Sequence, residues 1–251
     1  MSNEMFEDWL VVEEHFCPDY VRKYESIMCQ GNGYLGIRAA VEEDYPRNVR
    51  YTLVAGTFDK MEKKPTTELP NSADTMAVVL AADGICLNLT EKTGRAYRRT
   101  LNLKNGLLQR SFVWSPREGL QLEFCSRRFV SLKDRHVIGQ QITVKVLEGT
   151  GNLLISSGIQ GGERYGEPHF QLVQSCVQED ILQYAEVTHE SRIPFVTTAS
   201  VRAWREDGKG NSKPVRLRRE AQPDQVMAEC EERLLAGETL ILEKLCRVAT
   251  G

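Results

Sequence analysis

The side chains that could perform acid–base or metal chemistry are scattered along this chain of 251 residues. The histidines lie far apart in sequence, and the chain contains no zinc-protease, nucleophile-elbow or phosphate-loop motif. Isolated histidines are more often hydrogen-bonding groups than catalysts, which is our prediction for His15, His136, His169 and His189. We therefore predict no catalytic residue and no metal site.

Adjacent carboxylates are the other candidates for acid–base work, and they occur at Glu13–Glu14, Glu42–Glu43 and Glu231–Glu232. Consecutive side chains of a β-strand point to opposite faces of the sheet. Each pair is therefore predicted to be a poor catalytic dyad.

Two segments are weak candidates for anion binding. Residues 161–166 are glycine-rich, but Pro168 follows instead of a helix, so their amides lack the helix dipole that favours phosphate. We expect a loop there. Residues 215–219 alternate apolar with basic side chains, which predicts a half-buried edge strand whose charges discourage further pairing.

Short alternating segments must position all of these side chains. Residues 85–89, 120–124 and 141–146 alternate between apolar and polar types, and Asp83-Gly84 is a strong hairpin signal. Further turn signals bring strands back about every ten residues, as in a β-sandwich. The sequence predicts an all-β, large antiparallel sandwich with few or no helices, in a single domain over residues 1–251. The stretch with helical leanings is 224–235, which could equally be strands.

Composition limits the partners and the location. Charged residues make up 27% of the chain with a formal net charge of −3, so no strong field for a nucleic acid is expected. The first residues are acidic where a secretory leader is basic, and no apolar run reaches the ~20 residues of a membrane span. The seven cysteines lack metal-ligand spacing, which favours reduced thiols in the cytoplasm, with burial predicted for Cys86, Cys125, Cys230 and Cys246.

Six blocks resemble, in the same order, the amino-terminal domain of the glycoside hydrolase family 65 maltose, trehalose and kojibiose phosphorylases. They are 26–38 (SIMCQGNGYLGIR), 54–59 (VAGTFD), 68–71 (ELPN), 97–110 (YRRTLNLKNGLLQR), 128–136 (RFVSLKDRH) and 158–161 (GIQG). The chain departs from the family pattern at Asn102 and Gln160, where the family has Asp, which weakens any cation-binding role at these positions.

The resemblance implies a super-sandwich like that of galactose mutarotase, followed in the family by a helical linker and an (α/α)6 barrel with the catalytic glutamate and the phosphate loop. There, a carboxylic acid protonates the glycosidic oxygen while phosphate attacks the anomeric carbon with inversion. Phosphate is a co-substrate, and no other cofactor is implied. Because barrel elements are absent from these residues, the chain alone is expected to be inactive.

The resemblance also implies that this domain packs on the barrel, contributes to a homodimer and lends loops to the rim of the sugar site. Our rim candidates are Asn32, Gly33, Tyr34, Gly36 and Arg38, with residues 59–71 behind them. These residues could instead have purely structural roles. Asn32-Gly33 would form a positive-φ turn, Gly36 would allow a close backbone approach, and Arg38 would pair with a buried carboxylate. Six large aromatic side chains could stack on a sugar if exposed, but a core role is expected for them: Trp9, Trp114, Trp204, Tyr34, Tyr51 and Phe58.

Three functions remain open from the sequence. A non-catalytic domain of a disaccharide phosphorylase or hydrolase predicts an exposed apolar patch where the rest of the enzyme docks. An independent carbohydrate-binding module predicts a row of exposed aromatic side chains. A mutarotase-like epimerase requires a histidine and a carboxylate facing each other across the sheet.

Overall fold

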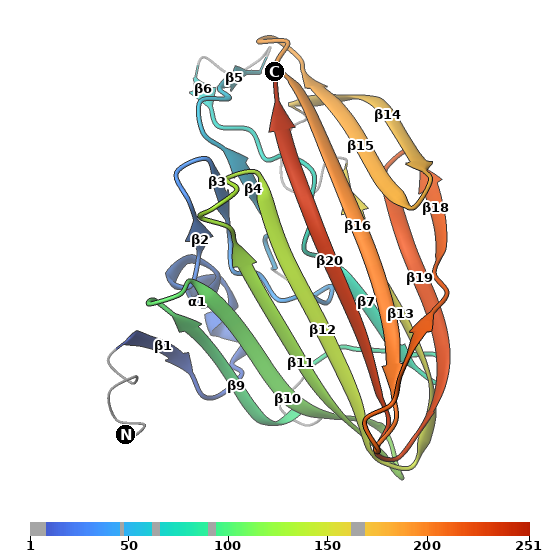
Figure 1. Cartoon of the computed structure of the whole chain (residues 1–251). Helices are drawn as coiled ribbons and strands as arrows, with labels where there is room; N and C mark the ends of the chain where they lie inside the picture. Colours follow the sequence, from blue (N-terminus) through green and yellow to red (C-terminus); the bar gives the residue numbers. More distant parts are fainter. Residues whose placement is uncertain (1–8, 46–47, 62–65, 90–93, 162–168) are drawn as a thin grey trace.

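The computed structural model describes residues 9–45, 48–61, 66–89, 94–161 and 169–251. Its strands form two large antiparallel sheets that pack face to face, with the amino-terminal segment beside them (Figure 1). The predicted antiparallel β-sandwich is confirmed. No helix in the part of the chain that is described is long and apolar enough to cross a membrane.

The larger sheet has ten strands whose alternation matches the sequence pattern. Ile142 and Val144 on β12 are buried against the second sheet, and Lys145 between Val144 and Val146 is exposed. The order across the sheet is β1 (Leu10–Glu13), β9 (Gly94–Asn102), β10 (Leu107–Arg117), β11 (Leu120–Val130), β12 (Val137–Glu148), β20 (Thr239–Thr250), β16 (Pro194–Glu206), β15 (Ile181–Thr188) and β14 (Phe170–Gln178), with β17 (Ser212–Val215) pairing with β16.

The second sheet has five strands, and its hairpin was visible in the sequence. Asp83 and Gly84 join two paired strands with φ values of 49° and 78°, the left-handed backbone that a tight two-residue turn needs. The strand order is β18 (Arg218–Gln222), β19 (Gln225–Leu235), β13 (Thr150–Gln160), β7 (Val78–Ala82) and β8 (Ile85–Cys86).

The structure decides one open alternative and corrects two local expectations. Residues 225–235 form strand β19, which pairs with β13 along its whole length, so the helical leaning is overridden. The basic run 215–219 is not one strand, because it is divided between the end of β17 and the start of the edge strand β18. Cys86 is exposed and Cys125 partly exposed, whereas Cys230 and Cys246 are buried as predicted. Of the glycine-rich segment, residues 162–166 lie outside the described residues.

The amino-terminal segment contributes small elements on both sides of the predicted turn at Asn32-Gly33. A short helical region comes first, and the segment 59–71, expected to be irregular, contains a two-stranded ladder. These elements are η2 (Pro18–Tyr20), α1 (Val21–Ile27), β2 (Gln30–Gly31), β3 (Leu35–Ile37), β4 (Thr52–Val54), β5 (Asp59–Lys60) and β6 (Thr67–Glu68).

Buried charges bind this segment to the inner face of the ten-stranded sheet. Arg110 on β10 donates to Glu42 at 2.9 Å and to both oxygens of Glu43 at 2.6 Å, and all three side chains are almost completely buried. Arg99 and Arg128, on the neighbouring strands, donate to the carbonyls of Ala39 and Ala40. Arginine side chains therefore provide hydrogen bonds for a backbone that has no strand partner there.

We predict that Arg110→Met destabilises the protein by about 3–5 kcal/mol, because Glu42 and Glu43 would be left buried without their counter-ion. The measurement is the free energy of unfolding from urea titration at pH 7. The matched control is Arg98→Met on β9, which removes an exposed pair with Glu14 and should cost less than about 1 kcal/mol. Equal losses in the two variants would contradict this interpretation of the buried network.

Candidate functional site

The β2–β3 turn is attached to the loop between β11 and β12. The Asn32 side-chain oxygen accepts hydrogen bonds from the amides of Tyr34 and Leu35, at 3.0 and 2.8 Å. The Asn32 amide nitrogen donates to the carbonyls of Ser131 and Arg135, at 2.7 and 2.9 Å. Gly33 has φ of +86°, as the sequence predicted for this turn. Asn32 thus fixes two loops that are about a hundred residues apart in sequence.

Tyr34 lies at the end of the larger sheet where β20 finishes. Its hydroxyl is 3.2 Å from the hydroxyl of Thr250, and its ring centroid is 4.5 Å from that of His136. The Arg135 guanidinium is 5.1 Å from the centre of the same ring. The side chains of the turn, the β11–β12 loop and the end of β20 therefore form one partly exposed cluster, which we call the turn cluster.

Arg38 and Gly36 do not belong to the turn cluster. Arg38 pairs with Glu25 of α1 at 3.3 Å, so its predicted partnership with a buried carboxylate is confirmed. Burial raises the pKa of Glu25 despite this pair. The close approach predicted at Gly36 is wrong, because a Cβ there would meet open space, whereas a Cβ at Gly31 would lie 3.0 Å from the Leu35 carbonyl oxygen.

A second cluster joins β5 to the segment before β14. The buried carboxylate of Asp59 accepts hydrogen bonds from the Ser191 amide at 2.8 Å, the Ser191 hydroxyl at 2.9 Å and the His169 ring at 3.1 Å. Burial opposes ionisation, but these hydrogen bonds lower the pKa of Asp59 below its usual value. The other His169 ring nitrogen is 3.9 Å from Glu68. No sequence pattern indicates this contact, since 110 residues separate the partners.

The carboxylates of the buried network are unsuited to proton transfer. Glu42 and Glu43 were predicted to face opposite ways, but their backbone is irregular and both reach Arg110. Burial alone would raise the pKa of Glu42, but Arg110, Arg128 and Arg99 lower it to about 2. A carboxylate held ionised in this way cannot serve as a general acid near neutral pH.

Glu186 is a buried carboxyl whose pKa is raised toward neutrality. It lies on the inner face of β15, and burial raises its pKa to about 7, opposed by a hydrogen bond from the Ala73 amide at 3.0 Å. An epimerase of the mutarotase type needs a histidine opposite such a group. Within the described residues, the Glu186 carboxylate accepts its hydrogen bond from the Ala73 amide. The His169 ring contacts Asp59 and Glu68 rather than Glu186.

The outer face of the ten-stranded sheet carries a row of exposed apolar side chains, which we call the apolar row. Phe129 on β11 pairs with Gly139 on β12, and Gly139 pairs with Leu245 on β20. Leu245 is 56% exposed and Phe129 39%. The same shallow hollow has a volume of about 260 Å³, and it is also lined by Leu107 of β10 and by the polar side chains of Arg127, Gln141 and Glu243. The Phe129 ring covers Gly139, where a Cβ would lie 2.4 Å from a ring carbon.

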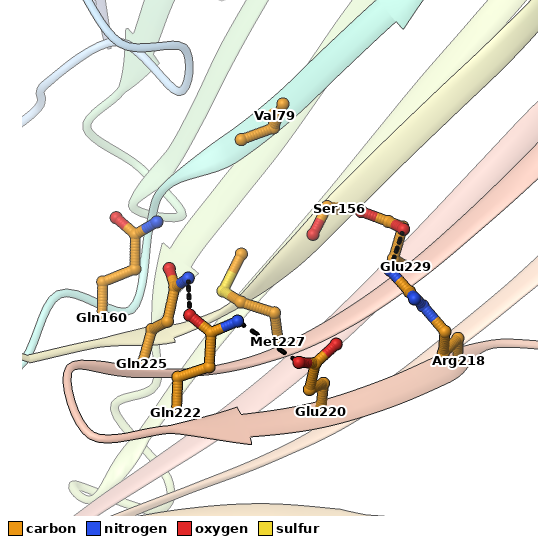
Figure 2. Close-up of a pocket in the computed structure, with 9 residues that line it drawn as sticks. All are labelled: Val79, Ser156, Gln160, Arg218, Glu220, Gln222, Gln225, Met227 and Glu229. Carbon is orange, nitrogen blue, oxygen red and sulfur yellow. Dashed lines mark hydrogen bonds and ion pairs between the residues drawn. The ribbon is translucent and has the colours of Figure 1, made fainter.

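The outer face of the five-stranded sheet carries a different hollow, which we call the polar groove. Its volume is about 230 Å³, and side chains of β7, β13, β18 and β19 surround it (Figure 2). Glutamine, glutamate, arginine and serine residues dominate the lining, with Met227 and Val79 between them. Within the described ranges, no three His, Cys, Asp or Glu side chains are grouped so that they could hold a metal ion.

Comparison with known proteins identifies relatives along nearly the whole chain. Residues 11–251 match the family model described as glycosyl hydrolase family 65, N-terminal domain. The chain is 32% identical over 235 residues to a kojibiose phosphorylase of Escherichia coli strain K12, covering 93% of this chain and 30% of that protein. It is also 32% identical over 250 residues to a kojibiose phosphorylase of Halothermothrix orenii, covering 98% of this chain and 31% of that protein.

A solved structure has the same fold. It is described as a putative kojibiose phosphorylase from human microbiome, with a TM-score of 0.86 and 17% sequence identity, and the match covers 98% of this chain and 33% of that one. The chain therefore spans about a third or less of the proteins that it matches.

We predict that Asn32→Ala loosens the loop between β11 and β12. The variant removes four hydrogen bonds, so we expect a loss of about 1–3 kcal/mol and faster amide hydrogen exchange in residues 131–136. Asn105→Ala, which removes one exposed hydrogen bond to the Leu107 amide, is the control and should leave this loop unchanged. Unaltered exchange in the Asn32 variant would contradict the assigned role.

We predict that Glu186→Gln makes stability less dependent on pH between about 5 and 8. The carboxyl has a pKa of about 7 when folded against an ordinary value of 4.5, so its contribution is complete below pH 4.5 and is lost as the pH rises through 7. The loss is on the order of 3 kcal/mol. Raised pKa values at Glu13 and Glu25 act in the same direction, so a shallower slope is expected rather than a flat one.

Urea titrations at a series of pH values would measure the effect of Glu186→Gln. The control is Glu118→Gln, in the exposed β10–β11 turn, which should keep the slope of the unsubstituted protein. A slope that Glu186→Gln leaves unchanged would show that this carboxyl does not bind its proton in the folded state.

Proposed function

The chain belongs to glycosyl hydrolase family 65 as its N-terminal domain, and we propose that it is the non-catalytic domain of an enzyme that cleaves α-glucosyl disaccharides. The enzyme's reaction is inverting phosphorolysis or hydrolysis of the glycosidic bond. Inorganic phosphate is its co-substrate in the first case, and the domain itself needs no cofactor. Both relatives are kojibiose phosphorylases, which supports phosphorolysis.

The apolar row is the observation that carries this proposal. Water-exposed Phe129 and Leu245 flank a hollow in the middle of a sheet face, and an uncovered patch of this kind is typical of a surface that another polypeptide covers. The relatives are about three times as long as this chain, so most of their length lies outside the matched region. We assign the row to packing against that remaining polypeptide, which includes the catalytic barrel.

The turn cluster is our candidate for the rim of the sugar site. Asn32 and Gly33 shape the turn, and Tyr34 and His136 stack beside the end of β20. Gly36 and Arg38 support the turn from within the domain instead of facing a ligand, because Arg38 is engaged with α1. We also propose that the domain contributes to a homodimer.

The alternative functions have less support. A carbohydrate-binding module of the aromatic type would need a row of exposed aromatic side chains. In the described part of the chain, the exposed aromatic side chains come from four separate segments instead: Trp9, Tyr20, Phe58 and Phe129. The exposure of Trp9 and Phe58 also differs from the expected core role. An epimerase is disfavoured because Glu186 and His169 have separate partners.

We further propose one domain over residues 1–251, working in the cytoplasm. All seven cysteines are free, which suits a reducing compartment. Burial raises the pKa of the Cys230 thiol to about 12 and that of Cys246 to about 11, so these two thiols are chemically inert.

The first test is an assay of the purified chain with maltose, trehalose, kojibiose and nigerose, with and without phosphate. We expect neither glucose nor glucose 1-phosphate above a mock preparation, because the family resemblance implies that the general acid belongs to the catalytic barrel. Turnover by the chain alone would overturn the non-catalytic assignment.

The second test places residues 11–251 into the Escherichia coli kojibiose phosphorylase in exchange for its matched region. We expect kojibiose phosphorolysis by this chimera, and at least a ~10-fold loss on Leu245→Glu, since a charge would be buried in the packed surface. Val173→Glu, on the exposed edge strand β14, is the control and should keep the activity. Equal activity of the two variants would refute packing through the apolar row.

A further inference from the structure

We propose that the polar groove on the outer face of the five-stranded sheet binds a neutral saccharide ring. This site is distinct from the turn cluster and from the apolar row, which lie on or beside the other sheet. The proposal rests on the proposed function only in the choice of glucose as the probe.

The floor of the polar groove offers an apolar surface to one side of a ring. Gly158 on β13 pairs with Met227 on β19, and a Cβ at Gly158 would lie only 2.1 Å from the Val226 carbonyl oxygen and 3.0 Å from the Met227 sulfur. The Met227 side chain therefore lies over a position where only glycine fits. Together with Val79 it provides a thioether and methyl groups that can contact the C–H face of a sugar.

The side chains around this floor form a chain of hydrogen bonds with unused capacity. Gln225 donates to Gln222 at 3.1 Å, and Gln222 donates to Glu220 at 3.3 Å (Figure 2). Each amide has two donors and an acceptor oxygen, so several groups on this rim stay available. Hydroxyl groups, which donate and accept equally, match such a mixed rim.

Gln160 lines the polar groove and carries a buried amide oxygen that no group of the described residues hydrogen-bonds. Its side chain is only 9% exposed. A buried amide without a partner is costly unless a bound molecule or water hydrogen-bonds to it. Ser156, which is 6% exposed, adds a hydroxyl beside it on the same strand face.

The charges in the lining favour a neutral ligand. The one arginine, Arg218, is paired with Glu229 at 3.0 Å, which leaves Glu220 as the uncompensated charge. A phosphate or carboxylate would be repelled by Glu220, and Arg218 would have to leave its partner to bind it. The volume of about 230 Å³ is below the range of about 300–1,000 Å³ typical of pockets for drug-sized ligands, so one ring fits better than two.

The test follows the Met227 methyl group by NMR in a chain labelled with ¹³C at its methionine methyls. Titration with glucose should shift this signal saturably, with a Kd on the order of 1–10 mM, because the groove is shallow and makes few contacts. The methyl of Met76, which is 0% exposed, serves as the internal reference. Glucose 6-phosphate should bind more weakly than glucose.

Two variants locate the binding. Gln160→Leu and Ser156→Ala should weaken glucose binding by about 3- to 10-fold, as expected for loss of a hydrogen bond. The control is Gln183→Leu, on the outer face of β15 in the other sheet, which should leave the affinity unchanged. Thermal unfolding of each variant verifies that it is folded.

Absence of a saturable shift at about 100 mM glucose would overturn the proposal, because binding that weak has no specificity. Unchanged affinity in both groove variants would also overturn it. Tighter binding of glucose 6-phosphate would contradict the neutral class of ligand. None of these outcomes bears on the chimera experiment, which reports on the apolar row, so the two proposals can fail independently.

Discussion

The contact between Arg110 and the two carboxylates of Glu42 and Glu43 is the interaction on which the arrangement of this protein depends. It joins the irregular amino-terminal segment to the inner face of a sheet that is otherwise packed mainly through apolar side chains. A buried pair of this kind contributes little net stability compared with apolar packing, but breaking it is costly. The main effect of this contact is therefore to hold the amino-terminal segment in one position, because any other position would leave the buried charges unpaired.

The consequences reach the candidate rim. Because Arg99 and Arg128 also hold the carbonyls of residues 39 and 40, the chain just after β3 is fixed at the sheet face, and β3 pairs with β2 immediately before that point. The turn at Asn32 is then close enough to bond to the β11–β12 loop. The arginines that hold Glu42 in place also keep its carboxylate ionised. The same contacts that position this side chain therefore prevent it from acting as a general acid.

The two outer faces of the sandwich differ in chemistry, although both are built from the same strand geometry. On the larger sheet, Phe129 and Leu245 leave apolar surface uncovered, which suits a permanent protein contact. On the smaller sheet, glutamines and glutamates bond to one another around Met227, which suits a small polar solute. In both hollows a glycine on a central strand, Gly139 or Gly158, is covered by a neighbouring large side chain. The two proposed functions, packing and ligand binding, therefore use the two opposite outer faces of the sandwich.

The sequence by itself determined the strands and the tight turns, because alternation with period two and a turn such as Asp83-Gly84 are local properties of the backbone. It also determined the family, through blocks spread over the chain. Only the tertiary structure decided that residues 225–235 are a strand, that Glu42 and Glu43 converge, and that His169 meets Asp59. Each of these depends on a partner far away in the chain, and pairing between distant segments leaves no periodic trace in either one.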